Sequence, residues 1–189
     1  MRFAKSLLAC GAVVATLAAG QAQAGYVVST WGDSSVHIIA AAFTAVGSFG
    51  VGQILPNGIG TDGSTIWVGT FVDSTVRAFD FSGNLLYSWG GTGFSNLQGL
   101  DFVNGQIAIA NGSEIQFRDP LTGALLNTIS GPNIQSTIEG IDFDGTSIWT
   151  ISDANLYAID PLSGNTVATI ANAAAGCSIC QPTRSNVTC

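Results

Sequence analysis

Three carboxylates stand at positions where a central site could form. Glu139 precedes Gly140 at the start of an expected strand, and Asp101 and Asp142 occupy matching positions in two such strands. General acid–base chemistry needs two groups whose surroundings separate their pKa values, and paired carboxylates can provide this. We therefore identify Asp101, Glu139 and Asp142 as candidate carboxylates at the end of a central channel. No nucleophile is spaced with a base, so we assign no catalytic or cofactor-binding residue and no cofactor, and we expect a protein that is not an enzyme.

Other residues with metal-binding chemistry are sparse. His37, the only histidine, aligns with Arg77 of the next repeat, which predicts a surface side chain. Residues 142–145 contain two carboxylates but lack the distal glutamate of an EF-hand loop. Hairpin turns account for these aspartates, so we predict no metal site.

The cysteines of the mature chain cluster near the C-terminus, at Cys177, Cys180 and Cys189. In an oxidising compartment such thiols form disulfides, here between Cys180 and Cys189 or, with strain, between Cys177 and Cys180. The odd thiol then stays free or links two chains. A redox-active pair would need a helix N-terminus, and zinc would need a fourth ligand. We therefore expect an incidental, structural or intermolecular role.

Residues 1–24 have the features of a signal peptide. Arg2 and Lys5 precede an apolar stretch, and Ala22-Gln-Ala24 is a small-residue cleavage site. We predict cleavage after Ala24 and a secreted or periplasmic protein without a membrane span in its mature chain. An alternative is lipoprotein processing at Cys10, but most of the apolar stretch lies beyond that residue.

The charge balance excludes whole classes of partner. Loss of Arg2 and Lys5 with the signal peptide leaves three basic residues against 12 acidic ones, a net charge of about −9. Nucleic acids and anionic membranes require clustered lysine and arginine. The sequence therefore predicts neither as a partner.

The strongest signal is internal repetition with a period of about 40 residues. Residues 26–37 align with 66–77, and five positions are identical. A second element begins with glycine and an aliphatic residue, at Gly58, Gly99 and Gly140. A third pairs an aspartate with a following glycine, at Asp80 and Gly83, Asp119 and Gly123, and Asp160 and Gly164.

Each repeat predicts four short strands. An Asp-Gly or Asn-Gly turn joins the first two strands, and the second carries Ile-Trp-Val or a similar run. The third alternates and ends at the recurring aspartate, which can accept hydrogen bonds from amides two or three residues on. We predict an all-β class, with a β-propeller-like domain at 25–176, blades at 26–50, 58–92, 98–131 and 139–170, and a tail at 177–189. The second-strand aromatic residues are expected to pack between blades: Tyr26, Trp67, Phe71 and Trp149.

The pattern resembles exported β-propeller-repeat proteins with NHL, YVTN or quinoprotein-like blades. Residues 78–89 are similar to a quinoprotein tryptophan-docking motif, although they are one residue short before the glycine. The resemblance implies a small propeller and leaves function open. Similar repeats occur in exported proteins with a Pro-Glu-Pro sorting tail, which this sequence lacks. An interaction or ligand-binding module for an unknown protein or carbohydrate is favoured. The alternatives are a propeller-family lyase or lactonase-type hydrolase, or a fragment of a longer propeller.

The strand count leaves the ring incomplete. The first repeat predicts three strands and the others four each, so a closed ring of four blades needs one more strand from the C-terminus. Residues 171–189 lack the pattern of a first strand. We therefore expect an open arc, or a small ring closed poorly by the tail. An open edge invites self-association.

Overall fold

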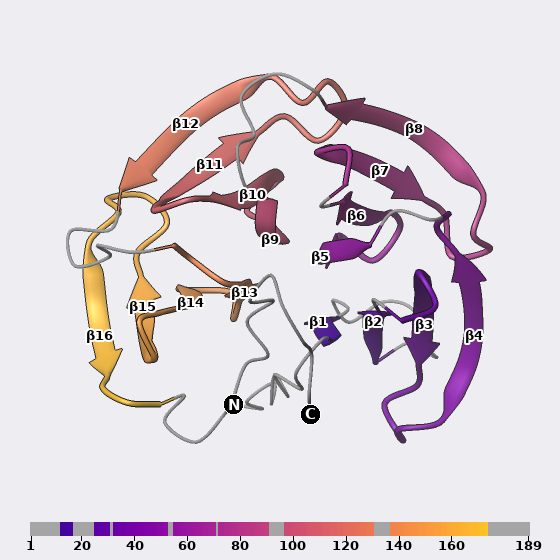
Figure 1. Cartoon of the computed structure of the whole chain (residues 1–189), viewed down its shortest axis with the longest axis horizontal. Helices are drawn as coiled ribbons and strands as arrows, with labels where there is room; N and C mark the ends of the chain where they lie inside the picture. The colour runs from indigo at the N-terminus through magenta and orange to yellow at the C-terminus, as the bar shows by residue number, and fades with distance from the viewer. Residues whose placement is uncertain are drawn as a thin grey trace, which may run out of the picture.

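The computed structural model describes residues 12–16, 25–30, 32–52, 55–70, 72–90, 97–130 and 137–173. These residues form four antiparallel sheets of four strands each, and none of them lies in a helix. Within each sheet the strands follow chain order, from the strand nearest the centre to the strand at the outside (Figure 1). The all-β, propeller-like architecture of about four blades is confirmed.

The strand bounds follow the repeat. The first sheet contains β1 (Ala12–Thr16), β2 (Tyr26–Thr30), β3 (Ser35–Ile39) and β4 (Ala45–Gly50). The second contains β5 (Pro56–Thr61), β6 (Ile66–Thr70), β7 (Thr75–Phe79) and β8 (Leu85–Gly90). The third contains β9 (Leu97–Val103), β10 (Gln106–Asn111), β11 (Glu114–Arg118) and β12 (Leu125–Ser130). The fourth contains β13 (Ile141–Phe143), β14 (Ile148–Ser152), β15 (Asn155–Ile159) and β16 (Thr166–Ile170).

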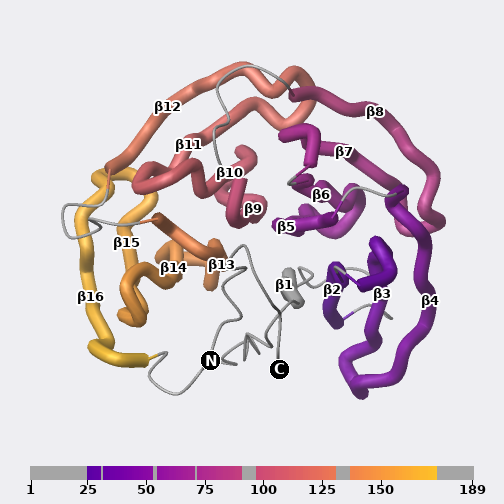
Figure 2. Tube along the Cα trace, in the orientation of Figure 1, coloured from indigo at the N-terminus to yellow at the C-terminus, as the bar shows by residue number. Residues whose placement is uncertain are grey.

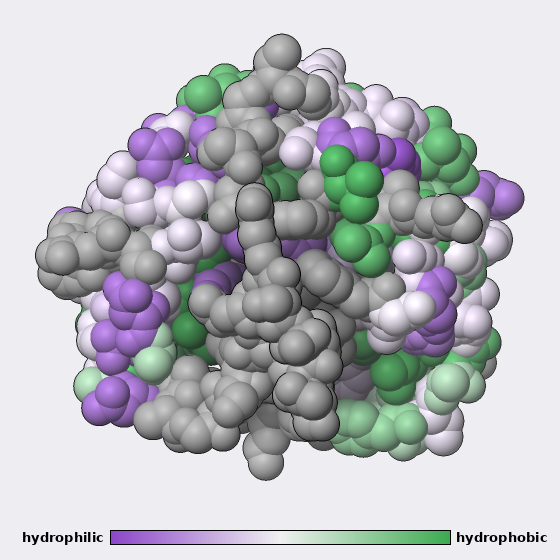
Figure 3. All heavy atoms as spheres, in the orientation of Figure 1, coloured by the Kyte–Doolittle hydropathy of each residue, from purple (hydrophilic) through white to green (hydrophobic). Residues whose placement is uncertain are grey.

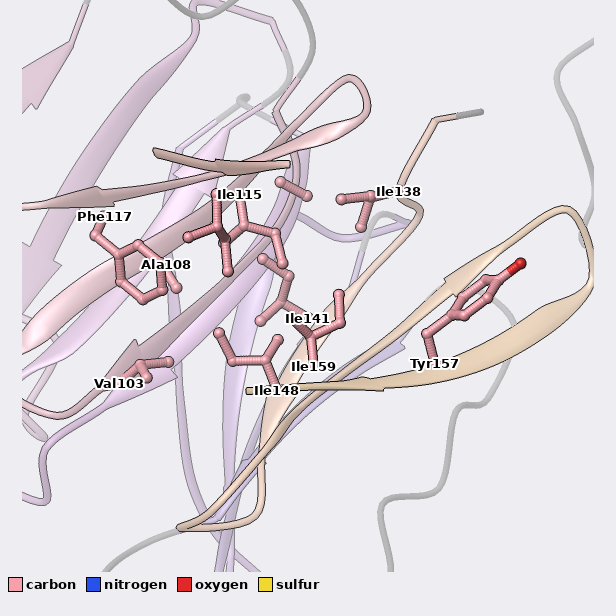
Figure 4. Close-up of a cluster of buried hydrophobic side chains, with 11 residues drawn as sticks. Val103, Ala108, Ile115, Phe117, Ile138, Ile141, Ile148, Tyr157 and Ile159 are labelled. Atoms are coloured by element: carbon pink, nitrogen blue, oxygen red, sulfur yellow. The ribbon is translucent and has the colours of Figure 1, made fainter. Parts of the chain in front are cut away.

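The core consists of three separate clusters, one between each pair of consecutive sheets. Successive side chains of a strand point to opposite faces, so each sheet has a forward face toward the next sheet and a rear face toward the preceding one. In the cluster between the third and fourth sheets, Ala108 and Ile115 meet Ile148 and Ile159 (Figure 4). Equivalent positions form the other two clusters. Each isoleucine buried in this way contributes about 1.5–3 kcal/mol to stability.

Close approach of the inner strands explains the glycine that opens each repeat. A Cβ added at Gly99 would lie 2.8 Å from the Cα of Gly140 in the next sheet. Gly58 faces Leu100 of the third sheet in the same way. Gly140 differs, because a Cβ there would meet nothing within 4 Å.

A second contact between consecutive sheets lies at the outer strands. The turn before β12 contains Gly123, whose φ of 71° favours glycine, and the ring of Trp89 packs on it. Trp89 Nε1 also donates a hydrogen bond of 2.9 Å to the carbonyl of Pro120. Phe49 on Gly83 and Ile129 on Gly164 repeat this contact in the other two interfaces.

The first sheet differs from the prediction in the origin of one strand. We expected three strands from the first repeat, and a fourth only if the C-terminal tail closed the ring. The structure instead pairs β1 with β2, from Ala12 opposite Thr30 to Thr16 opposite Tyr26. Residues 12–16 belong to the predicted signal peptide. Of residues 171–189, only 171–173 are described, and they form a turn after β16.

The four sheets lie along an arc, with β4 and β16 toward its two ends (Figure 2). Inner strands of consecutive sheets contact one another, β1 with β5, β5 with β9, and β9 with β13. Among the described strands, no comparable contact joins β13 to β1.

Replacement of Gly99 by alanine tests the close approach of the inner strands. Gly99→Ala should lower the free energy of unfolding by about 1–3 kcal/mol, because the new methyl group overlaps backbone atoms of Gly140. Gly140→Ala is the matched control and should change it by less than about 0.5 kcal/mol. Urea denaturation of both variants measures the difference. Equal effects would contradict the assigned contact.

Removal of β1 should expose the inner edge of β2. We expect the β2 amides that face β1 to exchange hydrogen at least about tenfold faster in residues 25–189 than in the full chain, because open strand edges lose protection. Amides of β6, in the second sheet, serve as the internal control. Equal exchange of β2 in the two proteins would show that another segment covers this edge.

Candidate functional site

Asp101 is the most deeply buried carboxylate among the described residues that the sequence singled out. It lies on β9, opposite Ala108 of β10, and its exposed fraction is 7%. Oδ1 accepts a hydrogen bond of 2.7 Å from the backbone N–H of Phe102. Oδ2 accepts one of 2.8 Å from the backbone N–H of Phe143, on β13. The carboxyl group therefore joins the inner strands of the third and fourth sheets.

The surroundings of Asp101 favour its protonated form. Burial raises the pKa most, the charge of Asp142 raises it further, and the two backbone N–H groups lower it, which leaves the pKa at about 8. A carboxyl group with such a pKa holds its proton at neutral pH. Asp101 is therefore a buried carboxyl group, mainly protonated at neutral pH, within a contact between two sheets.

Asp142 occupies the matching position of the fourth sheet. It lies opposite Trp149 in the pairing of β13 with β14, and its side chain is half-buried. Because Ile148 and Ile159 point back to the third sheet, Trp149 and Asp142 lie on the forward face. The structure thus brings Asp101 and Asp142 close enough for their charges to interact.

Glu139 lies two residues before β13 and is half-buried. Its backbone N–H donates a hydrogen bond of 2.9 Å to the carbonyl of Ile151. This bond extends the pairing with β14 to a residue that precedes the first residue of β13.

The recurring turn aspartates act as the sequence predicted. Asp119 Oδ1 accepts hydrogen bonds from the N–H groups of Leu121 and Thr122, at 3.0 and 2.8 Å. Asp80 and Asp160 accept equivalent bonds in their own turns. These hydrogen bonds lower the pKa of all three carboxyl groups, with the side chain and N–H of Asn84 contributing most at Asp80.

In the segment 142–145, which was compared with an EF-hand loop, Asp144 is bonded within its turn. Asp144 Oδ1 accepts from the N–H groups of Thr146 and Ser147, both at 2.8 Å. Its Oδ2 accepts a bond of 2.7 Å from Trp149 Nε1. The described residues contain no group of three or more histidine, cysteine, aspartate or glutamate side chains arranged to hold a metal.

His37 lies in a hairpin that the next repeat reproduces. Its Nε2 is 3.5 Å from Asp33 Oδ2 and 3.4 Å from Thr30 Oγ1. A proton relay needs one ring nitrogen on the carboxylate and the other on the hydroxyl, whereas here one nitrogen faces both. In the second sheet Arg77 takes the same place and donates to Asp73 Oδ2 at 2.6 Å. His37 is therefore a partly exposed hairpin residue whose ring lies beside the Asp33 carboxylate.

The two ends of the arc carry apolar faces that the sequence analysis did not identify. The Trp149 face is the forward face of the fourth sheet, where strand register places Trp149, Ile151, Leu156 and Ile170 together. The Tyr26 face is the rear face of the first sheet, where strand register places Tyr26, Val28 and Ile39 beside Thr30 and His37, and where the turn residue Phe43 also lies. The Phe43 ring stacks on Tyr26 with centroids 5.3 Å apart. Both faces could have been found by aligning the repeats. The alignment identifies their residues once it is known which positions of each strand face the next sheet and which face the preceding one.

The prediction for the cysteines lies wholly outside the described residues, and the prediction for the second-strand aromatic residues lies partly outside them. Cys177, Cys180 and Cys189 are all outside, as is Phe71. Trp67 packs between sheets as expected, stacked on Phe102 with centroids 5.1 Å apart. None of the described segments forms a helix with the length and hydropathy that a membrane crossing requires.

Comparison with known proteins supports the fold. No family model and no curated protein matches the sequence. The structure is similar to that of glutaminyl cyclase from Myxococcus xanthus, with a TM-score of 0.70 and 18% identity, over 90% of this chain and 74% of that one. For hydrazine synthase from Kuenenia stuttgartiensis the TM-score is 0.58 and the identity 16%, over 82% of this chain and 47% of that one. For the Pan2 WD40 domain from Neurospora crassa the TM-score is 0.56 and the identity 13%, over 80% of this chain and 50% of that one.

The chain spans about half the length of the last two proteins. At these levels of identity the similarity establishes a β-propeller fold that occurs in an enzyme and in a WD40 domain alike.

The raised pKa of Asp101 predicts a pH dependence of stability. Between about pH 4 and pH 8 the folded protein binds a proton that the unfolded chain has released, so this group makes stability fall as pH rises through that window. Asp101→Asn should reduce the loss of unfolding free energy between pH 5 and pH 8 by about 2 kcal/mol or more. Urea denaturation across this range gives the measurement.

The control is Asp119→Asn. The lowered pKa of Asp119 contributes stability that is present above about pH 4 and is lost as pH falls further. Asp119→Asn should therefore lower the unfolding free energy by the same amount across pH 5 to pH 8, without changing the slope of its pH dependence. A parallel shift for Asp101→Asn as well would refute the assignment of the buried proton.

Proposed function

We propose that this protein is an exported, non-catalytic interaction module, in which a propeller-type scaffold binds a protein partner through the ends of its arc. The observation that carries this proposal is the pair of apolar end faces. Ile170 on the Trp149 face is 50% exposed and Phe43 on the Tyr26 face is 74% exposed. The other apolar residues that define the two faces are half-buried. Apolar side chains that gather on one surface in this way mark interaction sites in soluble proteins.

The outer strands add apolar surface around the rim. Val46, Leu86, Leu126 and Val167 occupy equivalent positions of the four outermost strands, and all are exposed. Figure 3 shows apolar side chains, in green, at several places along the rim. These positions lie outside the sheet-to-sheet clusters, so they are available to a partner that extends beyond the end faces.

A protein fits these faces better than a carbohydrate does. Sugar sites combine an aromatic platform with several polar groups that fix the hydroxyls. Here leucine, isoleucine and valine surround the aromatic rings, and the nearby aspartates of the turns are already bonded within their own loops. The expected negative charge of the mature chain also favours an uncharged contact.

The enzyme alternative ranks second. The observation in its favour is Asp101, whose raised pKa suits a general acid. Both of its carboxyl oxygens accept backbone hydrogen bonds, however, and the side chain is buried between two sheets. A substrate would have to displace one of these bonds to reach the proton.

Photo-crosslinking in the exporting bacterium tests the proposed function. A benzophenone amino acid at Ile170 or at Phe43 should give covalent adducts with protein, because a partner covers these side chains. The control position is Leu162, which is 86% exposed but lies in a turn away from both end faces, and it should give none. Mass spectrometry of the recovered protein also shows whether the chain begins at Gly25, as export with cleavage after Ala24 requires. Absence of adducts at both end faces would overturn the proposal.

A further inference from the structure

We infer that the partner is a second copy of this chain, whose Tyr26 face packs on the Trp149 face of the first copy. The inference rests on the proposed function and specifies its partner. The resulting contact is a sheet-to-sheet interface of the kind that already occurs three times within the chain.

The Trp149 face matches the two forward faces that precede it. Trp67 of the second sheet and Ala108 of the third align with Trp149, and both are buried against the following sheet. Ile129, which aligns with Ile170, is only 7% exposed because the turn of Gly164 covers it. The Trp149 face is therefore built for a following sheet.

The Tyr26 face matches the rear faces of the other sheets. Ile66 and Val68 of the second sheet align with Tyr26 and Val28 and are fully buried against the first sheet. Tyr26, Val28 and Ile39 are instead half-buried. The Tyr26 face is therefore built for a preceding sheet.

The inner strand of the fourth sheet is shaped for the same contact. Gly58 and Gly99 each lie against the backbone of the next sheet, whereas a Cβ at Gly140 meets nothing within 4 Å. Asp142 stands on the forward face at the position from which Asp101 accepts the N–H of Phe143. The fourth sheet thus repeats the elements that bind a following inner strand.

A second copy supplies the required face because each chain carries both halves of this interface. The two halves lie on the first and fourth sheets, whose inner strands make no contact comparable to those between consecutive sheets among the described residues (Figures 1 and 2). The expected net charge of the mature chain is about −9, so two copies repel unless the contact is made mainly through uncharged surface. Apolar side chains gather on both end faces, beside Asp142 on the Trp149 face and beside Thr30 and His37 on the Tyr26 face. Two copies joined in this way bury both pairs of faces.

The side chains at the outer strands also fit. In the internal interfaces a large residue of one sheet packs on a turn glycine of the next, as Trp89 does on Gly123. At the end faces the turn position holds Phe43, with φ of 60°, and the outer-strand position holds the smaller Ile170. Ile170 thus matches Ile129 of the third sheet, whereas Phe43 stands where the other three sheets have glycine.

Size-exclusion chromatography with light scattering tests the inference on the purified chain. The wild-type protein should have twice the mass of one chain. Ile170→Asp and Phe43→Asp should each raise the dissociation constant at least tenfold, because each places a charge in an apolar contact. Gly140→Val should act in the same way by blocking the approach of the inner strand. Leu162→Asp is the control and should remain a dimer.

A mixing experiment identifies the direction of the contact. A copy with Phe43→Asp keeps an intact Trp149 face, and a copy with Ile170→Asp keeps an intact Tyr26 face. The mixture should therefore recover a dimer, with one sound interface, that neither variant forms alone. A symmetric contact between two Trp149 faces would instead leave Phe43→Asp dimeric. Unfolding of all variants by urea confirms that the fold is retained.

The outcomes separate this inference from the proposed function. A monomeric wild-type protein that still forms adducts at Ile170 with a different protein overturns the second copy and leaves the interaction module standing. A dimer that survives all three substitutions overturns the assigned faces. Adducts whose mass is twice that of the chain, lost with Gly140→Val, support both.

Discussion

The structure depends on the packing of consecutive sheets, which covers both faces of the second and third sheets and one face of the first and fourth. A four-stranded sheet with apolar side chains on both sides cannot be stable alone, because each exposed face leaves several aliphatic side chains in water. The three internal interfaces satisfy this constraint with isoleucine, valine and leucine, and with glycine where inner strands come closest. The hydrogen bonds within the sheets define the blades, and apolar burial between the sheets orders them.

Much of this arrangement follows from local patterns in the sequence. The aspartates at 80, 119 and 160 predicted their turns because a short carboxylate side chain bonds amides two or three residues away. The alternating third strands and the repeat length predicted four-stranded units. These features depend on residues within one hairpin, so one repeat at a time contains the information.

Features that join different repeats were harder to predict. The sequence singled out Asp101 as a candidate channel-end carboxylate but did not indicate that its carboxyl group bonds an amide 42 residues away on a neighbouring sheet. The sequence predicted three strands for the first sheet and no segment with the pattern of another, whereas the structure supplies one from Ala12–Thr16, a stretch whose composition indicates a signal peptide. The forward and rear faces become visible only after pairing assigns each residue a side. Long-range contacts of this kind have no short sequence signature.

The glycine turns of the outer strands have a consequence for the order of the blades. Phe49, Trp89 and Ile129 differ greatly in size, and each fills a position above a glycine in the following sheet. The repeats therefore share one backbone plan without being interchangeable modules. A shuffled chain in which the second and third units exchange places would set the indole of Trp89 over Gly164, which now receives an isoleucine. If the unit arose by duplication, selection would act on each outer-strand side chain together with the glycine turn that it covers. The order of the blades along the chain is thus fixed by side-chain volume at these outer contacts.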